Sequence, residues 1–299
     1  MSTHGPNEIR RCRPLLGTFV EIQAFGTNAA DLNHAIDAAF AAIAQVHRLM
    51  SFHDRKSDVS RLNCDAFHKS VRIHPWTWRV LKSAQEFSLN SDGVFDVTVA
   101  RRLVKWNYVP KYKAADGSGS WRDIALHANR NVRFRRPTTI DVGGIAKGFA
   151  VDRGVDVLKR NGAMGGIVNA GGDLRVFGPA SQLVHLRDPA QPTRAAGILR
   201  LCERAIATSG TYFARRRNRG RWVSPLLDGR SGRAARDLIS VTVAAENCMT
   251  ADALTKVVFA LRERAAPLLE RYSADALLLE QDGGSSWMFH PTCDASRQI

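Results

Sequence analysis

The sequence has few cysteines and no long apolar run. Five cysteines in 299 residues are odd in number, widely scattered and never arranged as C-x-x-C. That pattern argues against both a disulfide framework and a thiolate metal site. No apolar run approaches the roughly 18 residues that a transmembrane helix needs, and the first residues show no signal peptide or lipobox. We therefore expect no transmembrane segment and a cytoplasmic location.

Acidic residues are also scarce. Lys and Arg number 43 against 28 Asp and Glu, which gives a net charge of +15. A protein this basic attracts anions such as nucleotides, acidic proteins, nucleic acid or a membrane surface. Its 44% hydrophobic content is that of an ordinary globular chain, which excludes a disordered or fibrous protein.

An arginine cluster is the most concentrated part of this charge. It comprises Arg215, Arg216, Arg217, Arg219 and Arg221, with Trp222 beside it. Nucleic-acid binding through phosphates is one interpretation. A solvated basic loop that docks an acidic partner or screens phosphates is the favoured one, so nucleic acid is an unlikely partner.

Apolar spacing and turn residues predict the order of helices and strands. Helices are expected at 31–50, 75–89, 147–161 and 251–272, the last with Thr250 as N-cap, and strands at 15–25, 139–142, 167–169, 183–186, 197–202, 238–245 and 276–280. Residues 111–120 have loop composition and are the expected boundary between two lobes. Strands with few regular helical crossovers predict an α+β fold with mixed or antiparallel sheets flanked by helices.

Three glycine-rich segments follow predicted strands or apolar stretches. Asp141 is followed by Gly143, Gly144 and Lys147; Gly171 and Gly172 precede Asp173; Thr208 and Ser209 precede Gly210. Glycines allow close approach of the backbone to a ligand, and a helix start favours an anion. Each segment alone is explained equally well as an ordinary turn. Three together favour a phosphate ligand.

Asp252 is predicted to lie in the first turn of the last long helix. It can complement the helix dipole and pair with Lys256 four residues later. Carboxylate oxygen is also a preferred Mg²⁺ ligand. The residues alone leave both interpretations open, a structural carboxylate or a metal ligand.

Seven segments together resemble the FAD:protein FMN transferase family, also called the ApbE family. They occur in family order and are RPLLGTFVEI (13–22), LMSFHDRKSDVSRLN (49–63), GVFDVTVARRLVKWNY (93–108), IDVGGIAKGFAVDR (140–153), VNAGGDLRVFG (168–178), ATSGTY (207–212) and TADALTKVV (250–258). The resemblance implies a two-lobed α+β domain over 13–285 between a basic tail, 1–12, and a C-terminal tail, 286–299. It also implies FAD in a cleft between the lobes.

The reaction that the resemblance implies is transfer of FMN from FAD to a Ser or Thr hydroxyl of a target flavoprotein, with release of AMP. By position, the implied FAD contacts are Leu16, His53, Lys105, Trp106, Asn107, Asp141 and Lys147, with Gly171, Gly172, Thr208 and Ser209 from the glycine-rich segments. An implied Mg²⁺ site maps to the carbonyl of Gly144 and to Asp252 and Thr255, with Lys256 at the last ligand position. Asp252 and Lys256 are the implied catalytic residues.

Two positions depart from the family pattern. Lys256 stands where members usually have a threonine ligand, and an ammonium has no lone pair to give a metal. At about 4 Å, Lys⁺ and Mg²⁺ would repel by roughly 8 kcal/mol at an effective dielectric near 20. Either Lys256 points away, or it replaces part of the metal's charge and binds the phosphates itself.

Pro225 is the second departure, in WVSPLLDGRSG (222–232), where the family typically has a histidine that is a candidate base. Proline cannot accept a side-chain proton, and nothing in the sequence brings His185 or Asp228 to the acceptor hydroxyl. Three hypotheses follow. The chain is a slow FMN transferase, or a FAD-binding homologue with impaired catalysis, or a hydrolase that converts FAD to FMN and AMP.

Overall fold

The computed structural model describes residues 7–111, 117–189, 191, 193–211, 215–234, 238–280 and 284–288. Its helices are α1 (Ala29–Met50), α2 (Asp58–Asp65), α3 (Pro75–Asn90), α4 (Ala100–Lys105), α5 (Ala146–Arg160), α6 (Cys248–Leu261) and α7 (Ala266–Arg271), with short 3₁₀ turns at Val97–Val99, Trp121–Asp123, Ala128–Arg130 and Arg262–Ala265. No helix of these ranges is long and apolar enough to cross a bilayer.

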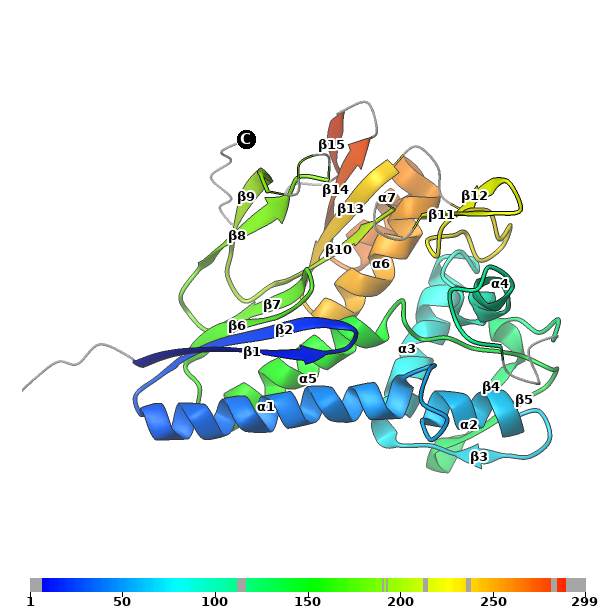
Figure 1. The fold of residues 1–299 in the computed structure, drawn as a ribbon, viewed down its shortest axis with the longest axis horizontal. Helices are drawn as coiled ribbons and strands as arrows, with labels where there is room; N and C mark the ends of the chain where they lie inside the picture. The colour runs from blue at the N-terminus through cyan, green and yellow to red at the C-terminus, as the bar shows by residue number, and fades with distance from the viewer. Residues whose placement is uncertain are drawn as a thin grey trace, which may run out of the picture.

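An eight-stranded antiparallel sheet is the centre of the fold (Figure 1). In spatial order its strands are β1 (Asn7–Leu15), β2 (Thr18–Gly26), β6 (Gly165–Ala170), β7 (Asp173–Phe177), β10 (Ala205–Gly210), β13 (Leu238–Ala245), β14 (Asp275–Glu280) and β15 (Ser285–Met288). Smaller sheets pair β3 (Val71–Arg72), β5 (Asn131–Phe134) and β4 (Ile124–Leu126), then β8 (Gln182–Arg187) with β9 (Ala195–Leu201), and β11 (Arg216–Asn218) with β12 (Arg221–Val223). The α+β prediction is confirmed.

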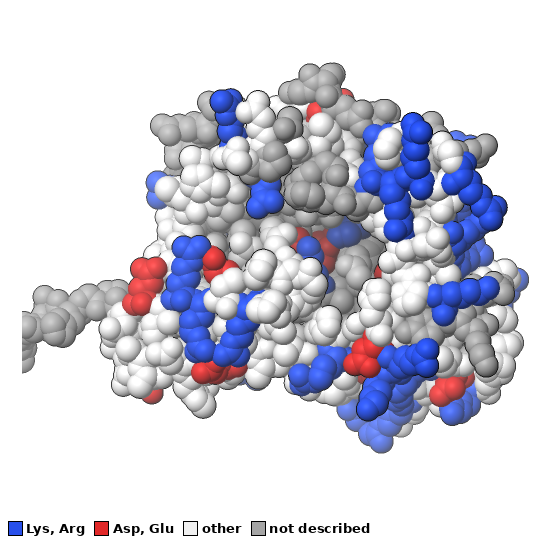
Figure 2. Space-filling view, in the orientation of Figure 1, with Lys and Arg blue, Asp and Glu red and all other residues white. Residues whose placement is uncertain are grey.

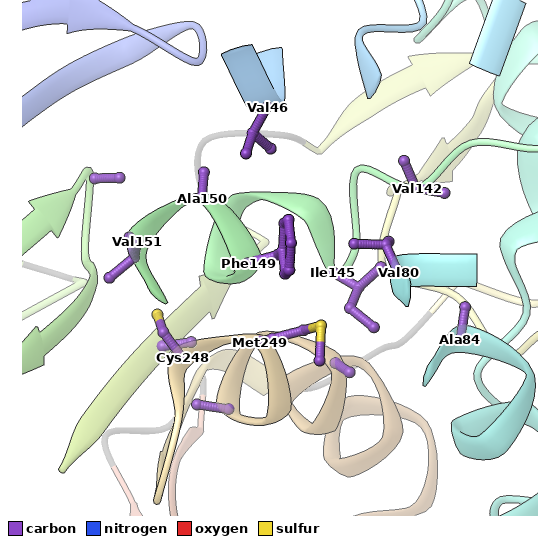
Figure 3. Packing of buried hydrophobic residues seen from close by; sticks show 14 of the residues in the cluster. Val46, Val80, Ala84, Val142, Ile145, Phe149, Ala150, Val151, Cys248 and Met249 are labelled. Atoms are coloured by element: carbon purple, nitrogen blue, oxygen red, sulfur yellow. The ribbon is translucent and has the colours of Figure 1, made fainter. Parts of the chain in front are cut away.

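Helices α1, α5 and α6 form a layer on one face of the sheet. Helix α1 turns an apolar stripe inward, which includes Ile36, Phe40 and Ile43, and runs beside α5 (Figure 1). Phe149 of α5 lies between Val46 of α1 and Met249 of α6 (Figure 3). The hairpin β8–β9 packs on the opposite face, over a separate apolar cluster. The sheet therefore shields the inner side of the helical layer from solvent.

Helices α5 and α6 approach unusually closely at Gly148. A β-carbon there would overlap the carbonyl of Cys248, and the Gly148 N–H donates to Asp252 Oδ2 at 3.0 Å. One turn later on α5, Asp152 accepts from the N–H groups of Cys248 and Met249, both at 2.9 Å. Those N–H groups open α6, so Asp152 supplies acceptors for a helix start that lacks intrahelical partners. The two aspartates hold one helix against the other.

The sequence predictions for most elements are confirmed. Helices α1, α3 and α5 and strands β2, β6, β8, β9, β13 and β14 lie within a few residues of the expected ranges. Strand β1 was missed: it pairs with β2 through the turn at Leu16 and Gly17, so residues 7–12 of the expected basic tail are part of the sheet. Of the predicted loop 111–120, residues 112–116 lie outside the described residues.

Two element predictions are wrong. Residues 139–142 form no strand, because Asn63 and Val97 satisfy their backbone: Ile140 exchanges hydrogen bonds with the Asn63 amide and Asp141 N–H donates to Val97. The expected helix 251–272 is broken after Leu261, where Arg262 has φ 54°, and its N-cap is Asn247 rather than Thr250. A positive φ ends a helix because intrahelical hydrogen bonds cannot continue through it.

Gly148→Ala tests the close approach of α5 and α6. The added methyl group would collide with backbone, which cannot rotate away, so we expect a loss of about 2 kcal/mol or more in unfolding free energy. Gly197→Ala is the matched control, since a β-carbon added there would have nothing within 4 Å and its φ is ordinary. Urea unfolding of both variants measures the difference. Equal stabilities would contradict the packing described here.

Candidate functional site

Four charged side chains gather where α5 and α6 meet the sheet. Lys147, in the first turn of α5, forms an ion pair with Asp173 of β7 at 3.0 Å between Nζ and Oδ2. Lys256 of α6 forms an ion pair with Asp252 Oδ1 and also donates to the Asp252 carbonyl at 2.9 Å. Both carboxylates are buried, whereas both lysines keep some exposure. We call these four residues the charged cluster.

Two hydroxyls join the cluster from the sheet and from α6. Thr255 Oγ1 donates to the Asp252 carbonyl at 2.7 Å and lies 2.8 Å from Ser209 Oγ of β10. Thr208, one residue earlier, pairs instead with Thr242 of β13 at 2.9 Å. Ser209 and Thr255 thus lie beside the cluster. The Thr208 hydroxyl is directed to the neighbouring strand.

Burial and mutual attraction set the ionisation of the cluster. Burial, with a further contribution from Asp252, raises the pKa of Asp173 to about 6 despite the opposing charge of Lys147. Burial opposes the charge on Lys147, but Asp173 and Asp252 outweigh it and raise the pKa of that lysine. Lys147 therefore stays a cation at neutral pH, next to a carboxylate that is costly to ionise.

Two tight turns lie side by side at this end of the sheet. The β1–β2 turn contains Leu16 and Gly17 and the β6–β7 turn contains Gly171 and Gly172, all four with positive φ, as in two-residue hairpin turns. A β-carbon at Gly171 would overlap Thr18, so the turns touch. Glycine at 171 permits both the backbone conformation and this contact. The strand ends bring these turns to the edge that carries Asp173.

A cavity of about 990 Å³ is lined mainly by residues of α4 and of the segment that follows it. Its lining includes His53, Lys105, Trp106 and Asn107. His53 follows α1, whereas the other three lie at and just after the end of α4. Desolvation raises the pKa of Asp141, opposed by the Gly143 N–H and by His53, a residue of the cavity lining. Figure 2 shows a separate feature, a hollow near the middle of the view with charged side chains of both signs inside it.

Gly144 lies against Lys256 of the charged cluster. A β-carbon at Gly144 would lie 3.5 Å from Cε of Lys256 and 3.6 Å from the ring of Phe95. The Gly144 turn and the Asp252 helix, 108 positions apart in the sequence, are therefore neighbours. The sequence predictions Asp141, Gly144, Lys147, Asp252, Thr255 and Lys256 all fall around this point.

Sequence reasoning missed part of the cavity wall. Arg216 of β11 donates to the Trp106 carbonyl at 2.5 Å, and its guanidinium lies 3.7 Å from the centre of the Tyr108 ring. Tyr108 in turn donates to the Val223 carbonyl at 3.0 Å. The arginine run carried a signal of anion attraction, but no sequence pattern indicated that one of its members supports the wall.

The possible replacements for a histidine at position 225 lie elsewhere or are engaged. Pro225 is half-buried, close in sequence to the Val223 carbonyl that Tyr108 contacts. His185 is exposed on β8, in the hairpin that packs on the opposite face of the sheet. Asp228 accepts from the Arg230 N–H at 2.8 Å within its own loop. Neither supplies a free base next to the cluster.

The residues do not fit a divalent metal ion. One oxygen of Asp252 is held by Lys256, the other by the Gly148 N–H, and Thr255 is engaged by Ser209. Within the described ranges no group of three or more His, Cys, Asp or Glu side chains could hold a metal. A hard cation needs free oxygen ligands, and the ammonium of Lys256 occupies the one carboxylate of the Mg²⁺ site that the family resemblance implied.

An eight-stranded antiparallel sheet with helices on one face and a charged cluster at one end of the sheet defines an α+β protein. The chain belongs to the ApbE family, whose model matches residues 16–278.

Solved structures and curated relatives agree with that assignment. The ApbE protein of Thermotoga maritima is 28% identical with a TM-score of 0.82, covering 94% of this chain and 96% of that one. A FAD:protein FMN transferase of Rhodobacter capsulatus is 25% identical over 91% of this chain, which spans 55% of that relative's length. A FAD:protein FMN transferase of Vibrio cholerae is 26% identical over 74% of this chain and 71% of its own length.

The raised pKa of Asp173 predicts how stability changes with pH. From pH 3.8 to about 6 the folded protein keeps a proton on Asp173 that the unfolded chain loses. The free energy of unfolding should therefore fall across this range, by about 3 kcal/mol relative to Asp173→Asn, and stay level above it. Thermal or urea unfolding of both proteins at pH 4 to 8 measures the difference. A difference that rises with pH would refute the assignment.

Proposed function

We propose that this chain is a FAD:protein FMN transferase, which moves FMN from FAD to a Ser or Thr hydroxyl of a target flavoprotein and releases AMP. The observation that carries the proposal is the charged cluster, with its two partly exposed lysines, inside a chain of the ApbE family. The names of the relatives support it. The expected domain boundaries and the cytoplasmic location stay predictions.

In this proposal the diphosphate of FAD faces Lys147 and Lys256. Their ammonium groups are the cations of the cluster, and both side chains retain exposure towards a ligand. Charge-assisted hydrogen bonds to phosphate oxygens are stronger than neutral ones. The glycine turns at Gly144 and Gly171 would let the nucleotide approach the backbone closely.

The cavity would hold a ring system of FAD. Its volume of about 990 Å³ is at the upper end of ordinary ligand pockets. Trp106 supplies an aromatic face and His53, Lys105 and Asn107 supply polar groups. A large aromatic ligand fits a cavity of this size and lining.

The proposed transfer exchanges the phosphoanhydride bond of FAD for a phosphoester bond to the acceptor. The acceptor oxygen bonds to the phosphorus of the FMN half, the bridge to the AMP phosphate breaks, and AMP leaves with the electrons of that bond. The acceptor proton must pass to a base or to solvent, and Pro225 supplies none. Lys147 and Lys256 would stabilise the charge that develops on the departing phosphate.

The second candidate is a FAD-binding homologue with impaired catalysis, which Pro225 specifically favours. The two are separated by incubating the purified protein with FAD, with and without an extract of the cells that make it, and quantifying AMP, FMN and protein-bound flavin. AMP release together with a covalently fluorescent protein supports transfer. FAD binding with no AMP supports the homologue, and FMN and AMP with no acceptor would indicate hydrolysis.

Trp106→Ala should weaken FAD binding by about tenfold or more, because stacking on an aromatic side chain contributes about 1–3 kcal/mol per ring. Quenching of flavin fluorescence on titration measures the dissociation constant. Trp222→Ala is the matched control, since Trp222 lies on β12 with 52% of its surface exposed and is absent from the cavity lining. If the two variants weaken binding equally, the ring is not bound at Trp106.

Pro225→His should raise the rate of transfer to the acceptor found above by about tenfold or more, within the ~100- to 10,000-fold range of a general base. FAD affinity should stay unchanged, and the pH–rate profile should gain a rise near pH 6.5, the ordinary pKa of histidine. Pro225→Gln controls for removal of the proline. An identical gain in the glutamine variant would show that backbone freedom, not the imidazole, is responsible.

A further inference from the structure

Lys256 is directed at the position where a metal would need oxygen ligands. Its ammonium contacts both the side-chain Oδ1 and the backbone carbonyl of Asp252, the latter at 2.9 Å, and its stem lies against Gly144. Of the two alternatives that the sequence left open, this geometry excludes the one in which Lys256 points away. The ammonium therefore occupies the carboxylate that the family resemblance implied as a metal ligand, and its stem lies beside Gly144, another implied ligand.

The neighbouring donors are already satisfied without a metal. Asp252 Oδ2 accepts from the Gly148 N–H at 3.0 Å and the Thr255 hydroxyl bonds to Ser209 and to the Asp252 carbonyl. A metal ligand must turn a lone pair to the ion, and a buried polar group that loses its partner is costly. Metal binding here would require breaking contacts that the fold itself depends on.

The formal charges of the cluster also cancel. The two carboxylates, Asp173 and Asp252, are matched by two ammonium groups, Lys147 and Lys256. A divalent cation would give this buried cluster an excess of positive charge, whereas the same cluster without Lys256 would carry one negative charge and attract a cation. Lys256 therefore supplies the positive charge that a bound metal would supply at this site.

One N–H of Lys256 remains for a ligand. Asp252 takes two of the three N–H groups, and the described residues supply no partner for the third. The side chain is 19% exposed, so that N–H is accessible to a solvent-side anion. A phosphate oxygen is the kind of acceptor that suits a charged donor at this depth.

We propose that Lys256 is a built-in counter-ion that replaces the divalent metal, so that this chain binds a nucleotide diphosphate without Mg²⁺. The proposal rests on the FAD ligand of the proposed function. It deepens that function by making the cation at the diphosphate part of the protein.

The first measurement is FAD affinity of the whole protein in EDTA and in millimolar Mg²⁺, followed by quenching of flavin fluorescence. The dissociation constants should agree within about threefold, since removing a metal removes nothing that the site uses. A requirement for Mg²⁺ in the unmodified protein overturns the proposal. No binding of FAD in either buffer overturns the proposed function instead.

The second measurement uses Lys256→Thr and Lys256→Met. In EDTA both should bind FAD at least about tenfold more weakly, because each lacks the charged donor. Mg²⁺ should restore binding to the threonine variant, which regains an oxygen ligand, and not to the methionine variant, which keeps only the apolar stem. Lys159→Thr is the matched control, on the exposed surface of α5 and paired with Glu203. It should bind FAD as the unmodified protein does.

The third measurement does not involve FAD. Mn²⁺ binding, followed by loss of the free-ion paramagnetic resonance signal, should be absent in the unmodified protein and reach one ion per chain in Lys256→Thr. One tightly bound Mn²⁺ in the unmodified protein, lost in Asp252→Asn, would overturn the proposal. The unmodified protein gives a decisive result in both the FAD and the Mn²⁺ measurements. The proposal can therefore be tested even if a variant fails to fold.

Discussion

The contact between α5 and α6 at Gly148 is the constraint on which the site depends. Two buried carboxylates stabilise this interface, one from each helix. Asp152 of α5 binds the first N–H groups of α6, and Asp252 of α6 binds an N–H of α5. The absence of a side chain at Gly148 lets the helices come close enough for both. Lys147 and Lys256 then arrive at the same end of the sheet.

Burial makes this arrangement costly unless its charges are matched. Isolated carboxylates at the depth of Asp173 and Asp252 would lose hydration without compensation. Each lies next to a lysine, and Arg175 of β7 pairs with Asp152 in the same layer at 2.9 Å. The ion pairs add little net stability by themselves, but removing one partner would leave a buried charge alone. The site is therefore specified as a set rather than as separate residues.

Local sequence patterns predicted individual helices and strands. Contacts between residues that are distant in the sequence determine how these elements pack. Helix α1 follows from apolar spacing, and the pair Asp252 and Lys256 follows from four-residue spacing on a helix. Asp173, in contrast, appeared only as the last residue of a glycine-rich segment, since nothing in the sequence couples it to Lys147 on another element. The failed strand at 139–142 has the same cause. Its backbone partners, Asn63 and Val97, lie on elements that local sequence does not connect to it.

Several side chains of the arginine cluster pack against aromatic rings. Arg216 points inward, over Tyr108 and onto the Trp106 carbonyl, and so stabilises the cavity wall. Arg215 and Arg217 flank Trp222, with guanidinium carbons 4.6 and 5.2 Å from its ring centre. A surface that tracked nucleic acid would present its cations freely to successive phosphates. Here three of the arginines are committed to aromatic rings of their own loop or wall. Figure 2 shows the basic side chains gathered over β11 and β12, on one side of the molecule. A local patch of this kind attracts anions without the extended track that nucleic acid requires.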